Sequence, residues 1–241
     1  MLRTAVLILI LALSPLNAIA EDVFKSDQDY EQWASNFYLN PELDKVVPAF
    51  HYYCNSKLSN ERNIRVLISH FYAAILRSNP KLVDELFRSV QPGANARVQS
   101  FALNTLWLVN SEQSRELLLN AKMNWELTDN NRRTIDQSIE IRPQWPLGTP
   151  ITSTSMIDIF WTIFSATGEA QPVKEIISIL HLAEDGTGKE IMIGGAAKWS
   201  LALQMRTHKR VVEIVRQELE TAAEPTKRLL GELLKKTGSI P

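Results

Sequence analysis

Residues 153–180, STSMIDIFWTIFSATGEAQPVKEIISIL, contain two helical patterns separated by a turn. In each half, apolar side chains recur at helical spacing: Met156, Phe160, Ile163 and Phe164 before the turn, and Ile176, Ile177, Ile179 and Leu180 after it. Thr167, Gly168 and Glu169 supply the turn. The stretch predicts a helix hairpin built for packing, and it shows no catalytic constellation.

The composition of the whole chain favours the same kind of structure. A chain of 241 residues that is 45% hydrophobic can bury a substantial core. It has only 9 glycines, and many of its 11 prolines stand at expected helix starts, which fits poorly with a β fold that needs many tight turns. We therefore predict an all-α fold of antiparallel helix hairpins, stacked as a short α-solenoid or an irregular helical array.

Residues 1–20 have the features of a cleaved secretory signal peptide. Arg3 precedes a short apolar run, and small residues stand at Ala18 and Ala20, where cleavage is expected. We expect an exported protein, periplasmic or secreted, that starts at Glu21. An uncleaved anchor is the alternative, although the apolar run is shorter than the roughly 20 residues of a membrane-spanning helix.

Downstream of this segment the sequence predicts two helical blocks, residues 21–141 and 153–241. Ser26, Ser111 and the Asn-Pro pair at 79–80 mark helix starts in the first block. Periodicity weakens between residues 120 and 152, and three prolines between 142 and 150 predict an extended connection over residues 142–152. We expect the two blocks to form one continuous domain.

The second block repeats features of the first. A shift of 90 residues aligns residues 83–87 with residues 173–177, and a shift of 97 aligns Leu106 with Leu203 and residues 116–118 with residues 213–215. The shift changes near the loop at residues 185–188. A duplicated set of helix hairpins would leave such a pattern; chance likeness between amphipathic helices is the alternative.

The helix pairs, the Asn-Pro starts and this internal repeat make residues 41–238 resemble an α-solenoid of the tetratricopeptide or HEAT type. The resemblance is one of architecture, because the residue signature of neither family is present. It implies a scaffold or binding protein, and it transfers no functional residues.

Candidate chemical sites are weak. The single cysteine, Cys54, lacks the partners of a metal site, and we expect it to be a buried free thiol. Residues 186–189 resemble the end of a phosphate-binding loop, but Ala183 and Glu190 replace residues which that motif requires, so we expect a turn. Gly194 and Gly195 predict a close helix approach, or a ligand against bare backbone. We assign no catalytic residue, cofactor or metal.

The net charge of −1, without a broad basic stripe, argues against nucleic-acid binding. Tryptophans and paired tyrosines on or beside the apolar faces suggest a surface for a protein or peptide partner, and the candidates are Tyr52, Tyr53, Trp145 and Trp161. Trp145 is either an anchor for its loop or an exposed recognition residue. The leading hypothesis is a non-enzymatic interaction protein; an enzyme with a site of scattered helix residues and a small-ligand or lipid carrier are the alternatives.

Overall fold

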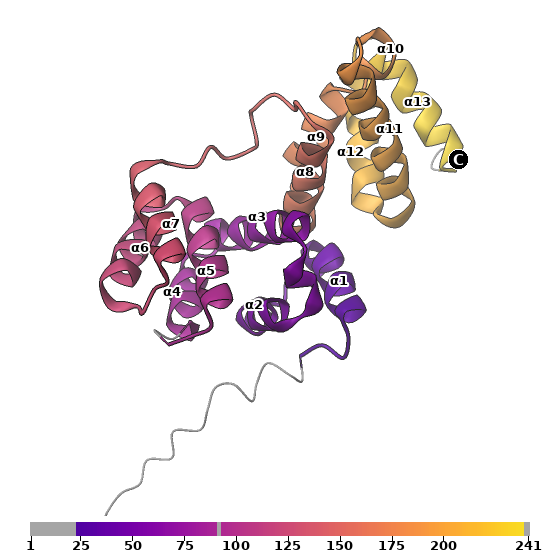
Figure 1. Cartoon of the computed structure of the whole chain (residues 1–241). Coiled ribbons are helices and arrows are strands. Elements are labelled where there is room, and N and C mark those ends of the chain that lie inside the picture. Colours follow the sequence, from indigo (N-terminus) through magenta and orange to yellow (C-terminus); the bar gives the residue numbers. More distant parts are fainter. Residues whose placement is uncertain (1–22, 91–92, 239–241) are drawn as a thin grey trace, which may run out of the picture.

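A computed structural model describes residues 23–90 and 93–238 of the chain (Figure 1). These residues form helices joined by short connections, without a β-strand among them, so the predicted all-α fold is confirmed. The α-helices are α1 (Asp27–Asn36), α2 (Val46–Asn55), α3 (Arg62–Ser78), α4 (Pro80–Ser89), α5 (Ala96–Val109), α6 (Glu112–Asn124), α7 (Asp129–Glu140), α8 (Thr154–Thr167), α9 (Ala170–Ser178), α10 (Leu182–Asp185), α11 (Lys189–Thr207), α12 (Lys209–Thr221) and α13 (Thr226–Lys236). Three 3-10 turns, η2 (Phe37–Leu39), η3 (Leu43–Lys45) and η4 (Lys57–Asn60), complete the first part.

The predicted hairpin is the α8–α9 pair, and α8 lies between the two parts of the molecule. Gly168 ends α8 with φ of +67°, and its amide donates to the Phe164 carbonyl at 2.7 Å. Ile163 belongs to the core of the first part, whereas Phe160 and Phe164 belong to that of the second. The hydrophobic core therefore forms two clusters that meet on α8.

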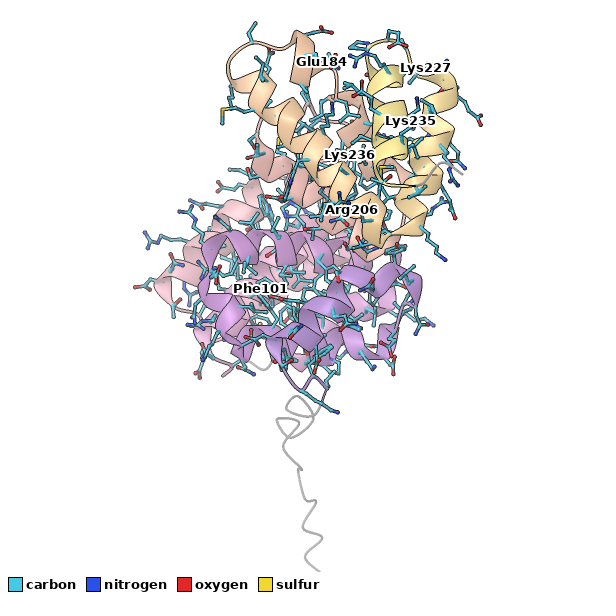
Figure 2. The ribbon with its side chains drawn as sticks, turned by 90° about the vertical axis from the view of Figure 1, so that its right-hand side faces the viewer. Phe101, Glu184, Arg206, Lys227, Lys235 and Lys236 are labelled. Atoms are coloured by element: carbon cyan, nitrogen blue, oxygen red, sulfur yellow. The ribbon has the colours of Figure 1, made fainter. Side chains whose placement is uncertain are left out.

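Aromatic rings dominate the first cluster. Phe101 of α5 lies 5.0 Å from Phe50 and 4.9 Å from Tyr53 of α2, measured between ring centroids. Tyr72 of α3 adds an edge-to-face contact with Phe50 at 5.4 Å. These contacts bring α2, α3 and α5 together around one centre, and Phe101 lies inside the first part of the chain in Figure 2.

The second cluster combines aliphatic side chains of α9, α11, α12 and α13 with aromatic side chains of α8. Within it α10 lies directly on α11, because a Cβ added at Gly194 would stand 2.2 Å from the Ala183 nitrogen. The predicted close approach is thus confirmed at Gly194. Gly195 differs, since a Cβ there would meet nothing within 4 Å.

The helix bounds recur at the offsets that the sequence suggested. Helix α6 (Glu112–Asn124) and helix α12 (Lys209–Thr221) begin and end 97 residues apart. Helices α4 and α9 begin 90 residues apart, at Pro80 and Ala170. Neighbouring helices pack against each other throughout the described residues, and the arrangement is compatible with a helical-repeat architecture.

The structure also corrects the sequence interpretation between residues 120 and 152. Helix α7 occupies part of the stretch whose periodicity was expected to break. Thr128 caps it by accepting a hydrogen bond from the Asn131 amide at 3.2 Å, and the buried Asn131 side chain donates to the Ala96 carbonyl at 3.0 Å. These polar contacts add to the packing of Ile135, which is fully buried in the first cluster, and together they stabilise α7.

The segment between α7 and α8 runs as an extended connection along one side of the molecule (Figure 1). The division into blocks at residues 142–152 stays a prediction. The predicted signal peptide, residues 1–20, lies outside the described residues. Among the helices of the described part, none is long and apolar enough to cross a membrane.

Candidate interaction surface

Two of the four aromatic residues predicted to bind a partner are buried. Tyr53 is fully enclosed in the first cluster, and Trp161 is 7% exposed in the second. Their rings are therefore out of reach of a partner, and each contributes to the core of the fold. Both lie on the apolar face of a helix, where core and surface aromatics have the same spacing in sequence.

Tyr52 is half-buried and joins α2 to α1. Its hydroxyl donates to the Asp27 carboxylate at 3.1 Å, and its ring lies 5.2 Å from that of Phe24. Burial is the main cause that raises the pKa of Tyr52, and the hydrogen bond to Asp27 adds to it. Tyr52 therefore holds α2 against α1 and the residues before it, within the first part of the chain.

Trp145 anchors the long connection onto α3. The guanidinium carbon of Arg77 lies 4.3 Å from the centroid of the indole, a cation–π contact, and the ring of His70 lies 6.1 Å away. Arg77 also donates to the Val109 carbonyl at 3.1 Å. Of the two roles considered for Trp145, the geometry corresponds to the anchor, and the four predicted aromatics do not share one surface.

The polar groups that could support chemistry are dispersed. Among the described residues there is no group of three or more His, Cys, Asp and Glu side chains that could hold a metal ion. His51 contacts the Ser89 hydroxyl at 2.8 Å and His208 contacts the Tyr38 hydroxyl at 3.0 Å, and burial lowers the pKa of both imidazoles. Each of these histidines joins one helical segment to another.

Cys54 is a buried free thiol, as the sequence predicted. Burial raises its pKa well above the usual value, so the thiol stays protonated at neutral pH and is a poor nucleophile. An open hollow of about 440 Å³ lies where α9, α12 and the start of α13 meet. In its wall Glu218 is neutralised by Lys174 at 2.8 Å.

The most unusual surface lies on α11, whose outward side is apolar. Met192 and Trp199 are each 69% exposed, and Leu203 is 44% exposed. With Gly195 they occupy positions that repeat on one side of a helix. We call Met192, Gly195, Trp199 and Leu203 the α11 stripe. The opposite side of α11 is buried against the second cluster, so the stripe faces solvent on a firmly packed helix.

Basic side chains stand at the end of α11 and on α13, the helix that Lys198 of α11 contacts through Glu232. Arg206 at the end of α11 and Lys227, Lys235 and Lys236 of α13 are all exposed, and the structure gives none of them an ion pair within the described residues (Figure 2). We call these four residues the basic border.

Two acidic groups of this region, Glu184 and Glu232, are paired with basic side chains. Arg228 of α13 contacts Glu184 of α10 and also Glu232, which lies 2.7 Å away. Glu232 also forms an ion pair with Lys198 of α11 at 3.4 Å, and this contact links α11 to α13. The second part of the molecule therefore combines the exposed apolar α11 stripe with the four labelled basic side chains of Figure 2, for which no ion pair is found in the described part of the chain.

The sequence does not distinguish the α11 stripe from a buried helix face. Trp199 is one of several tryptophans on or beside an apolar face, and its spacing is the same as that of the buried Trp161. Helix α11 has apolar residues on all sides, so its periodicity does not indicate which side faces the core. The presence of apolar residues on every side of α11 is the signal that could have revealed the stripe. A helix that packs against one core buries only one of its sides, so an apolar side is left over.

Comparison of the chain with protein-family models, with curated proteins and with solved structures gave no match.

Proposed function

We propose that this chain is an exported interaction protein of helical-repeat type, which binds another protein or a peptide through the α11 stripe. One observation carries the proposal: Trp199 and Met192, two helical turns apart on one side of α11, are both largely exposed, while the opposite side of that helix is buried. An exposed Trp and Met on a rigid helix are typical anchors of a protein interface. Export to the periplasm or beyond follows from the signal-like residues 1–20.

The geometry favours binding over the alternative functions. The described pKa shifts of histidine and tyrosine side chains arise chiefly from burial within helix contacts, whereas a catalytic site is expected to combine such shifts with a deep pocket. The hollow of about 440 Å³ beside α9, α12 and α13 is open, and so is a second one of about 520 Å³ that lies between Leu43 and the junction of α3 with α4. Neither resembles the closed apolar cavity of a lipid carrier.

Photocrosslinking in the native host tests this proposal. A benzoylphenylalanine placed at Leu203 in the α11 stripe is expected to crosslink one stoichiometric protein, and the same group placed at the exposed Met123 of α6 serves as the control. Adding Trp199→Ser to the Leu203 variant is expected to abolish the crosslink. Recovery of uncrosslinked chain from both positions would contradict the proposal.

A further inference from the structure

We infer that the occupant of the α11 stripe is an acidic amphipathic helix of another protein, which lies along α11 with its negatively charged edge toward α13. The inference rests on the proposed function and names the class of partner. Three observations support it: the shape of the stripe, its charged border, and the way in which the chain covers the corresponding face of another helix.

The shape of the α11 stripe suits a helix. From Met192 to Leu203 the stripe extends over three turns, about 16 Å at 1.5 Å per residue. Gly195 leaves open space beside its Cα, between the large side chains of Met192 and Trp199. This notch can receive one side chain of a partner helix, with Met192 and Trp199 on either side of it.

The charges near the α11 stripe indicate which charge the partner's surface should have. The basic border supplies four cations without an ion pair, whereas Glu184 and Glu232 are occupied by Arg228. Acidic residues along one edge of a docked helix would complement these cations and steer the association. The partner should therefore present apolar residues at helical spacing, with Asp or Glu beside them on the α13 side.

The chain itself covers the corresponding face of α5. At the offset of 97 residues, Trp199 corresponds to Ala102 and Leu203 to Leu106, and both α5 residues are fully buried. Other helices enclose α5, which contacts α2, α3, α4, α6 and α7. A helix is thus the element that buries this side in the first half of the molecule.

A second copy of the chain fits the stripe less well. A two-fold dimer would place the same patch on both sides of the interface. The basic border would then face an identical basic border, and like charges across an interface are repulsive. A membrane surface is also a weaker fit, because a lipid bilayer gives no side chain to fill the notch at Gly195.

Selection from an unbiased peptide library tests the inference. A display library of random peptides of about 16 residues, long enough to extend past the stripe at each end, is selected against the purified full chain. We expect enriched sequences with apolar residues three and four positions apart and with net negative charge. A synthetic peptide of the consensus sequence is then titrated against variants by fluorescence anisotropy.

The variants separate the apolar and charged contributions. Trp199→Ser is expected to weaken binding at least tenfold, the effect of losing a central aromatic anchor. Lys235→Glu with Lys236→Glu is expected to weaken it about tenfold and to reduce its salt dependence. The matched controls, Met123→Ser in α6 and Lys81→Glu with Arg88→Glu in α4, should bind as the parent does, and circular dichroism should show unchanged folding for all four.

Several outcomes would overturn the inference. Enriched peptides that are basic or neutral, or that bind the Trp199→Ser variant equally well, would exclude an acidic helix at this stripe. If no helical peptide is enriched, and if the chain cosediments with phosphatidylglycerol vesicles in a way that depends on Trp199, then the occupant of the stripe is a lipid surface. A non-acidic protein captured by the crosslink at Leu203 would overturn the inference while leaving the proposed function intact; loss of that crosslink would remove both.

Discussion

At the sequence offset of 97 residues, helix α5 is buried on nearly every side, whereas helix α11 leaves one side in solvent. In α5 the side that contains Ala102 and Leu106 is fully buried. In α11 the corresponding side contains Trp199 and Leu203, which are 69% and 44% exposed. Both sides are apolar in sequence, so the difference between them comes from the neighbouring helices.

Other helix pairs bury corresponding faces. Val83 and Leu86 of α4 are buried, as are Val173 and Ile176 of α9 at an offset of 90. In α6 and α12 the same holds at 97 residues for Leu118 and Val215. Helix α11 differs from these helices because one of its apolar faces is not buried by another helix. The comparison teaches that an apolar face shows where a contact is possible, and the surrounding chain decides whether the contact is made internally.

The matched pair Leu106 and Leu203 tests this comparison with the largest expected effect. Leu106→Ala leaves a cavity in a close-packed core and is expected to lower the free energy of unfolding by about 2–5 kcal/mol. Leu203→Ala removes a side chain that is 44% exposed and should cost less, about 1 kcal/mol or below. Urea denaturation followed by circular dichroism measures both. Equal losses would mean that the face of α11 is covered within the chain.

Gly194 and Gly195 provide a second matched pair, one on each side of α11. Gly194→Ala would place a methyl group within 2.2 Å of the Ala183 backbone nitrogen, so α10 must shift, and we expect a loss of about 1–3 kcal/mol from overpacking. Gly195→Ala meets open space and should stabilise α11 by up to about 1 kcal/mol through its helix propensity.

Thermal unfolding of the two glycine variants measures the contrast. A lowered melting temperature for Gly194→Ala together with an unchanged or raised one for Gly195→Ala is the expected result. If both substitutions were equally harmful, the outward side of α11 would be in contact with another part of the chain.

Much of the fold could be predicted from local sequence signals. The α8–α9 hairpin follows from two apolar patterns around Gly168, and the start of α6 follows from Ser111, whose hydroxyl accepts from the Ser114 amide at 3.1 Å. Helix α7 was missed because a polar contact holds it: the buried Asn131 side chain donates to Ala96. Such a contact depends on a distant segment and leaves no periodic pattern.

The candidate surface was harder to predict for the same physical reason. Tyr53 and Trp199 both lie beside apolar residues in sequence, yet one is fully buried and the other is largely exposed. Helical periodicity gives the direction of a side chain relative to its own helix. Which directions meet another helix depends on tertiary packing, and that information is absent from a single helical segment.

His208 allows a smaller, pH-dependent test of the contact between the end of α11 and the first part of the chain. The residue directly follows α11, and its Nδ1 lies 3.0 Å from the Tyr38 hydroxyl of η2. Burial lowers the pKa of His208 below its ordinary value of 6.5. The unfolded chain therefore binds a proton more readily, and the contribution of His208 to stability is present above pH 6.5 and lost as the pH falls below it.

The pH effect should not exceed about 1.4 kcal/mol per pH unit for one histidine. His208→Gln is expected to unfold with a shallower dependence on pH between neutral and mildly acidic buffer. Tyr38→Phe is the control, because it removes the hydrogen bond and keeps the titrating imidazole. His51 and His70, whose pKa values burial also lowers, retain their share in both variants. An unchanged slope in His208→Gln would show that His208 is hydrated in the folded chain.

Substitution of Trp199 is expected to have the smallest effect on stability, and it tests most directly whether the outward face of α11 is exposed. Because its side chain is 69% exposed, Trp199→Ser should change the free energy of unfolding by less than about 0.5 kcal/mol. Anilinonaphthalene sulfonate binds exposed apolar surface, and its fluorescence with the folded chain should fall on this substitution. Met123→Ser in α6 removes a side chain of similar exposure that has one exposed apolar neighbour on its helix, Leu119, and should change the fluorescence less. A large loss of stability without a change in dye binding would mean that Trp199 packs within the molecule, and the contrast between α5 and α11 would then fail.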